Sequence, residues 1–131
     1  MLSKGLRDEE KEKINELFNS MLELEFVPEL WKNEQRQKLS DNLKKILEFT
    51  LDDVETQSTE VLLEKLKSAD FEFSHYEQFA DLLLKSIPFE AEVGRSMLAK
   101  KAVAVYETAQ QESKMFSFGL IQKINKARAL L

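Results

Sequence analysis

The spacing of apolar residues predicts α-helices along the chain. Between residues 8 and 25 the apolar positions recur at intervals of three and one, which places them on a single helical face. Pro28 cannot lie inside that helix without loss of a hydrogen bond, so we expect the chain to turn near Phe26. A second helix with the same periodicity follows and ends near Leu47.

Capping signals indicate where the next two helices begin. Thr50 followed by Asp53 offers a side chain that caps a helix amino end, and Ser58 offers an alternative start for the same third helix. The segment 74–77, Ser-His-Tyr-Glu, has the pattern of a capping box. It predicts a fourth helix that begins there and ends before Pro88, because a residue before proline rarely stays helical.

The last 43 residues consist almost entirely of good helix formers. One continuous helix of that length would measure about 65 Å, whereas a compact domain of this size is only about 36 Å across. We therefore expect a break within residues 113–119, between a fifth helix from about 90 to 112 and a sixth from about 117. Residues 102–106 are apolar on all sides, which predicts that the fifth helix is surrounded by other helices.

These elements predict an all-α fold and a single helical domain over residues 1–131. About six helices group into three antiparallel hairpins, at residues 1–50, 51–88 and 89–131. This order suits either a helical bundle or a short solenoid-like stack of helix pairs.

Composition removes several classes of activity. The chain has 131 residues, of which 43% are apolar and 33% charged, in the range of globular domains. It has no Cys and a single His, which excludes thiolate chemistry and leaves little for histidine catalysis. Its three glycines lie far apart, so no phosphate-binding glycine loop is present. We expect no enzyme and no cofactor.

Two acidic patterns in the sequence are candidate metal sites. Glu72 and His75 have the spacing of a helical iron ligand pair, but such a site needs a second copy of the motif. We interpret His75 as a solvent-exposed residue of a first helical turn. Asp52, Asp53 and Glu55 are explained by their favourable position near a helix amino end. We therefore expect no metal.

Charge is unevenly distributed along the chain. The net charge is −5, yet residues 51–92 carry eleven acidic and three basic groups while residues 93–131 carry two acidic and seven basic ones. We expect the basic end to pack beside the acidic middle. The alternative is an exposed basic face that attracts nucleic acid or anionic lipid, but an acidic chain repels such polyanions at long range, so nucleic acid is not the expected partner. The candidate phosphate contacts are Lys100, Lys101, Lys114, Lys123, Lys126 and Arg128.

Large apolar side chains near two turns are the candidate partner contacts. Phe26, Leu30 and Trp31 surround Pro28, and Phe116 and Phe118 lie in the last break. Tryptophan is enriched at binding hot spots. The alternative interpretation is that Trp31 closes one end of the core.

Together these observations favour a non-enzymatic helical module that binds another protein or a second copy of itself, with a homo-oligomer as the expected state. One alternative is a small-ligand sensor with an apolar cavity near residues 102–106. Another is a magnesium-dependent hydrolase whose carboxylates meet only in the fold. The polar start and the longest apolar run of five residues predict a cytoplasmic protein without a membrane span.

Overall fold

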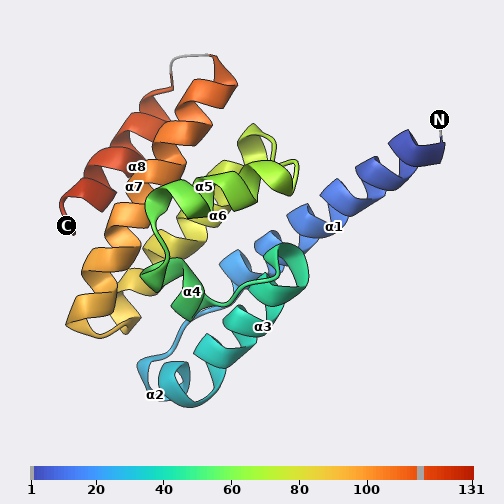
Figure 1. The fold of residues 1–131 in the computed structure, drawn as a ribbon. Helices are drawn as coiled ribbons and strands as arrows, with labels where there is room; N and C mark the ends of the chain where they lie inside the picture. The colour runs from blue at the N-terminus through green and yellow to red at the C-terminus, as the bar shows by residue number, and fades with distance from the viewer. Residues whose placement is uncertain (1, 115–116) are drawn as a thin grey trace.

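The computed structural model describes residues 2–114 and 117–131, with side chains from residue 9 onwards. Within these ranges every regular element is helical, so the predicted all-α fold is confirmed (Figure 1). The helices are α1 (Leu2–Glu23), α2 (Pro28–Leu30), a π-helical turn (Trp31–Gln35), α3 (Arg36–Leu47), α4 (Leu51–Thr56), α5 (Thr59–Ser68), α6 (Phe73–Ser86), a 3₁₀ turn (Ile87–Phe89), α7 (Glu92–Ser113) and α8 (Phe118–Arg128).

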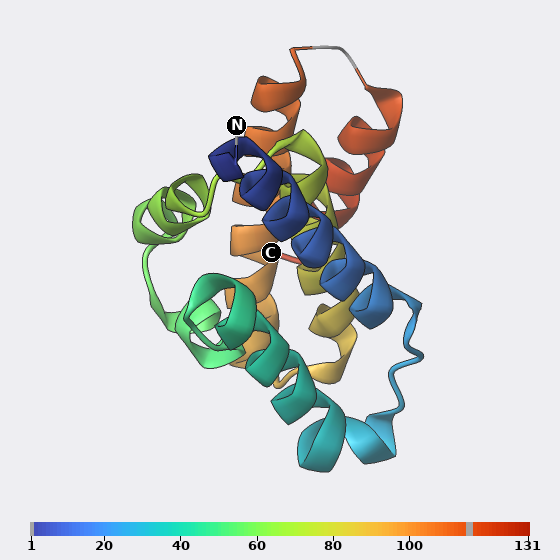
Figure 2. The same cartoon turned by 90° about the vertical axis from the view of Figure 1, so that its right-hand side faces the viewer.

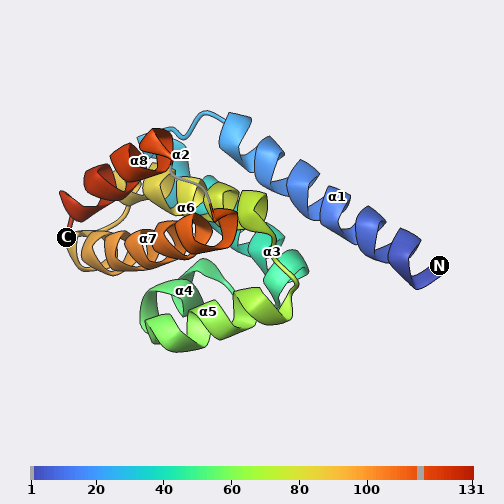
Figure 3. The same cartoon turned by 90° about the horizontal axis from the view of Figure 1, so that it is seen from above.

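Helix α7 occupies the centre of the bundle. It packs against α4, α5, α6 and α8. Seen from above, α7 lies between α6 and α8 on one side and α4 and α5 on the other (Figure 3), and the side view agrees (Figure 2). Ala102, Val105 and Tyr106 are fully buried. The central position predicted from the apolar segment 102–106 is therefore confirmed.

The closest packing crosses the boundaries of the predicted hairpins. Helix α6 packs mainly against α7 and then against α1, while α7 also pairs with α8 as expected. The amino-terminal part of α1 extends away from the other helices (Figures 1 and 3). The arrangement is bundle-like, because elements distant in sequence share one core.

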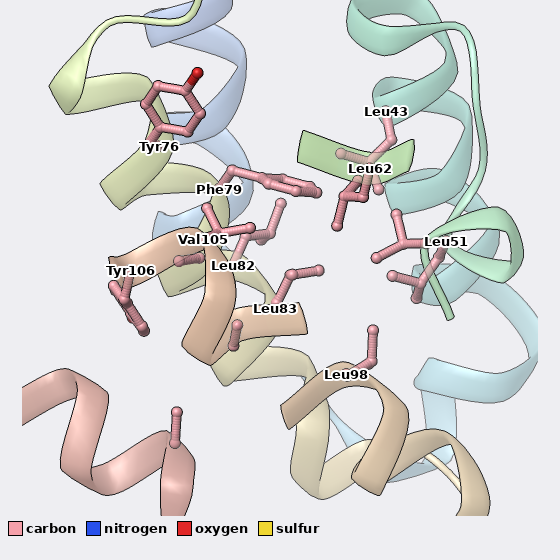
Figure 4. Packing of buried hydrophobic residues seen from close by; sticks show 14 of the residues in the cluster. Leu43, Leu51, Leu62, Tyr76, Phe79, Leu82, Leu83, Leu98, Val105 and Tyr106 are labelled. Atoms are coloured by element: carbon pink, nitrogen blue, oxygen red, sulfur yellow. The ribbon is translucent and has the colours of Figure 1, made fainter. Parts of the chain in front are cut away.

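The core is built from α1 and from α3 to α8. Figure 4 shows the central part, where Leu43, Leu51 and Leu62 face side chains of α6 and α7 such as Phe79 and Leu98. Each fully buried side chain of this size contributes about 1.5–3 kcal/mol relative to an exposed one. The largest fully buried side chains are Phe18, Leu43, Leu51, Leu62, Leu66, Phe79, Leu82, Leu83, Ile87, Leu98, Tyr106 and Leu120.

Both candidate starts of the third helix are used. Thr50 and Asp53 form a complete capping box at α4, and Ser58 Oγ accepts from the Val61 N–H at 3.1 Å to cap α5. The predicted third helix is therefore two short helices, which meet at Gln57.

The predicted capping box at Ser74 is wrong. Helix α6 begins at Phe73, and the Glu72 N–H donates to His75 Nδ1 over 3.0 Å. His75 Nε2 lies 3.3 Å from the Lys11 carbonyl oxygen, and the imidazole is 2% exposed. The expectation of a solvent-exposed histidine is also wrong, because α1 covers the first turn of α6.

The basic end packs beside the acidic middle, as expected. Lys123 Nζ of α8 is 2.7 Å from Glu77 and 3.0 Å from Asp81, both in α6. The Tyr106 hydroxyl donates to the same Asp81 carboxylate over 2.6 Å. The segment charges of the sequence are therefore partly neutralised across the α6–α8 contact.

Candidate functional site

A cleft lies between the α4–α5 junction and the first half of α7. Its volume is about 650 Å³. One wall is formed by the end of α4 and the first turn of α5, and the other by α7. The cleft is lined by Glu55, Thr56, Gln57, Ser58, Thr59, Glu60, Met97, Lys100 and Lys101.

The capping residues explain the shape of this wall. The α4 capping box fixes where that short helix begins, and Gln57 leaves the helix with an extended backbone. Ser58 then starts α5, so the first backbone N–H groups of α5 border the cleft. Helix amino ends carry partial positive charge and unpaired donors. The N–H groups of Thr59 and Glu60 have no protein acceptor within the described ranges.

Lys101 is the most deeply buried cation of the cleft. The residue is 5% exposed, and its Nζ donates to the Glu55 backbone oxygen over 3.3 Å. Among the residues that the structure describes, no carboxylate oxygen lies within 4.0 Å of this ammonium. Burial lowers the pKa of Lys101, and the charge of Lys100 lowers it further while Glu55 opposes the change.

A network of charged side chains supports the cleft from behind. Arg36 of α3 donates to Glu90 Oε1 through Nε and to Asp52 Oδ1 through Nη2, each over 2.7 Å. Its Nη2 is 3.5 Å from Glu55 Oε2. This network ties α3 and α4 to the segment before α7.

The Glu55 carboxyl group has an unusual environment. Its Oε1 is buried and has no hydrogen-bond partner, and it lies against the backbone of Gly94. The pKa of Glu55 is raised from 4.5 to about 7, mainly by burial and next by the Glu90 carboxylate, while Arg36 partly offsets both effects. Glu55 therefore changes protonation near neutral pH while it forms part of the cleft wall.

Gln57 contributes a second group without a partner. Its Nε2 is buried and makes no hydrogen bond within the described part of the chain. A buried amide N–H is costly when it lacks an acceptor. Gln57 lines one wall of the cleft with this Nε2 enclosed by the protein, whereas Lys101 on the other wall leaves N–H donors of its Nζ unused.

The acidic patterns of the sequence do not form a metal site. Asp52 and Glu55 face Arg36, Asp53 caps α4, and Glu72 with His75 caps α6. In residues 2–114 and 117–131 no cluster of three or more potential side-chain ligands is placed to hold a metal ion.

The predicted partner contacts are not brought together. Phe26 and Trp31 are buried, and with Phe89 they form an aromatic cluster whose ring centroids lie 4.9–5.7 Å apart. Leu30 of α2 and Phe118 of α8 are 44% and 74% exposed. Trp31 therefore closes one end of the core, in agreement with the alternative interpretation.

Phe116 lies outside the described residues, so the last break is represented only by Phe118. The role of Leu30 and Phe118 in binding stays a prediction. The phosphate-contact candidates are also separated. Lys123 and Arg128 pair with carboxylates, whereas Lys100 and Lys101 line the cleft.

Comparisons with protein-family models, with curated proteins and with solved structures found no match for this chain. No helix among the described residues is both long enough and apolar enough to cross a bilayer. The interpretation of the site therefore rests on its own geometry.

Proposed function

We propose that this protein is a non-enzymatic binding module and that the cleft beside α7 receives a segment of another protein chain. The observation that carries the proposal is the buried residue Lys101, which lines the cleft and has no carboxylate oxygen within 4.0 Å of its ammonium among the described residues. A buried charge is stable only when a counter-charge offsets the loss of water. A bound segment supplies such a charge.

The surface beside the cleft supports a protein segment as the occupant. Val93 and Met97, one helical turn apart on α7, are 70% and 38% exposed. Met97 also lines the cleft. An apolar strip that continues into a polar cleft suits an extended or helical segment with an apolar residue next to an acidic group.

The reactive side chains of the chain support a binding role over catalysis. The single histidine is used in a helix cap, and burial lowers its pKa. Of the two acidic side chains that line the cleft, Glu55 lies 3.5 Å from Arg36 and Glu60 is exposed to solvent. These groups position the cleft walls and are poorly placed to transfer protons to a ligand.

The test is selection of binding peptides from a random-sequence library against the purified protein. Met97→Glu removes the apolar lining and adds a repulsive charge, so we expect binding of the selected peptides to weaken at least about tenfold. Two matched variants, Leu30→Glu and Phe118→Glu, place the same charge on the other exposed candidates, and we expect each to leave affinity within about twofold.

Loss of binding in Leu30→Glu or Phe118→Glu, with Met97→Glu unaffected, would move the site to α2 or α8 and reject the cleft. Circular dichroism confirms that each variant keeps its helical content. Light scattering of the free protein tests self-association separately, because a second copy of this chain is the other expected partner.

A further inference from the structure

The inner end of the cleft combines several N–H donors that have no acceptor. Lys101 Nζ uses one of its three N–H groups on the Glu55 carbonyl, which leaves two. Lys100 lines the same space. The free N–H groups of Thr59 and Glu60 begin the adjoining helix α5.

We propose that this inner end is a phosphate subsite and that the segment received by the cleft carries a phosphorylated serine or threonine. This inference rests on the proposed function, because it names the group that the segment presents to Lys101. The inference goes beyond the proposed function because it specifies the chemistry of that group.

The donor set fits a phosphate better than a carboxylate. A phosphomonoester carries a charge of about −1.5 to −2 and three acceptor oxygens. Lysines act on it as point charges, and a helix amino end adds aligned N–H donors. A carboxylate has two oxygens and is best matched by the planar fork of arginine. Among the described residues that line the cleft there is no arginine, and Arg36 behind the cleft already donates to Asp52 and Glu90.

Two carboxylates also line the cleft, and they affect the subsite differently. The Glu55 carboxyl group has Oε1 against Gly94 and Oε2 near Arg36, and it lies more than 4.0 Å from Lys101 Nζ, although its charge raises the pKa of Lys101. Glu60 is exposed in the first turn of α5, where it competes for the same helix end. Its removal therefore strengthens phosphate binding.

A phosphoprotein fits this site better than a membrane or a nucleic acid. The subsite is recessed in a cleft of about 650 Å³, and the chain as a whole carries a charge of −5. An extended polyanion is repelled by that charge, whereas a single phosphate on a flexible segment reaches the buried lysine. The exposed Val93 and Met97 then contact the neighbouring residues of the segment.

The experiment compares two peptide pools with random flanking residues, one with a fixed phosphoserine and one with serine at the same position. We expect the phosphorylated pool to bind at least about tenfold more tightly. Lys101→Met keeps the apolar part of the side chain and should abolish the preference for the phosphorylated pool. Lys100→Met should weaken this preference. Lys126→Met, on the exposed face of α8, should leave it unchanged, and Glu60→Gln should increase it.

Inorganic phosphate provides a separate readout without any peptide. In amide NMR spectra of the intact protein we expect shifts at residues 58–61 and at Lys101 on addition of phosphate, but not of chloride at equal ionic strength. These shifts should disappear in Lys101→Met and persist in Lys126→Met.

Equal binding of both pools would overturn the phosphate subsite and leave the protein-binding cleft intact. Phosphate shifts without any peptide binding would reject the cleft as a protein-binding site and keep the anion subsite. Phosphate shifts that survive in Lys101→Met would reject the subsite as assigned here.

Discussion

The Glu55 carboxyl group lies so close to the α-carbon of Gly94 that a methyl group added there would be 2.8 Å from Oε1. This contact joins α4 to α7, and a side chain at position 94 would force the Glu55 carboxyl group to shift. Gly94 is buried inside a helix, where glycine is otherwise unfavourable by about 1 kcal/mol relative to alanine.

Gly94→Ala should destabilise the protein by about 1 kcal/mol, because steric overlap with Glu55 outweighs the gain in helix propensity. In a Glu55→Ala background, Gly94→Ala should instead stabilise the protein by about 1 kcal/mol. Urea unfolding of the wild-type protein, the two single variants and the double variant measures both free-energy differences. If Gly94→Ala changed the free energy of unfolding with the same sign in both backgrounds, this contact would not require glycine at position 94.

Glu55 should also make stability depend on pH. Its pKa is raised to about 7 in the folded chain from 4.5, so the folded state favours the protonated form. The stability due to this group is present below pH 4.5 and is lost as pH rises through 7, on the order of 3 kcal/mol in total. Glu55→Gln should remove this dependence and be more stable than the wild-type protein at pH 8. Parallel curves for the two proteins between pH 5 and 8 would contradict it.

His75 should act in the opposite direction. Burial lowers its pKa from 6.5, although the Lys11 carbonyl and Glu72 oppose the change. The stability due to neutral His75 is therefore complete above pH 6.5 and is lost as pH falls below it. Because this is the single histidine, its ring signals can be followed by NMR without assignment, and we expect a midpoint below 6.5. His75→Ala should cost about 1–2 kcal/mol at pH 8 through loss of the cap.

Trp31 should report on the core. Its 3% exposure predicts blue-shifted fluorescence and weak quenching by iodide. Trp31→Ala should cost about 3–5 kcal/mol, whereas Trp31→Phe, which keeps an aromatic ring beside Phe26 and Phe89, should cost less. Because the chain has one tryptophan, fluorescence of the wild-type protein is unambiguous. Strong iodide quenching would show that Trp31 lies on the surface and is available to a partner.

The parts of the fold that depend on local signals could be predicted from the sequence. Thr50 and Ser58 mark helix starts because each cap needs only residues three positions away. The existence of a break before α8 follows from the length of the segment, and its position from residues 113–119 being the least helical stretch. The capping box at α6 was assigned wrongly because two overlapping segments carry suitable side chains, and the contact of His75 with α1 selects between them.

The site depends on contacts between distant segments. The sequence predicts six possible phosphate contacts, which include Lys100 and Lys101. No local sequence pattern distinguishes the buried Lys101 from an exposed lysine. Its burial follows from packing of α7 against the end of α4, across 46 residues of chain. No sequence pattern indicates a role for Gln57, because an unpartnered amide can be recognised only when the surrounding structure is known.

The central position of α7 determines whether parts of the chain can fold separately. Since α4, α5, α6 and α8 all rest on this one helix, neither half of the molecule retains a complete core when the chain is divided before residue 92. Two fragments cut there should each be largely unstructured when separate and should regain helical signal on mixing. Such reconstitution would show that melting is one cooperative event.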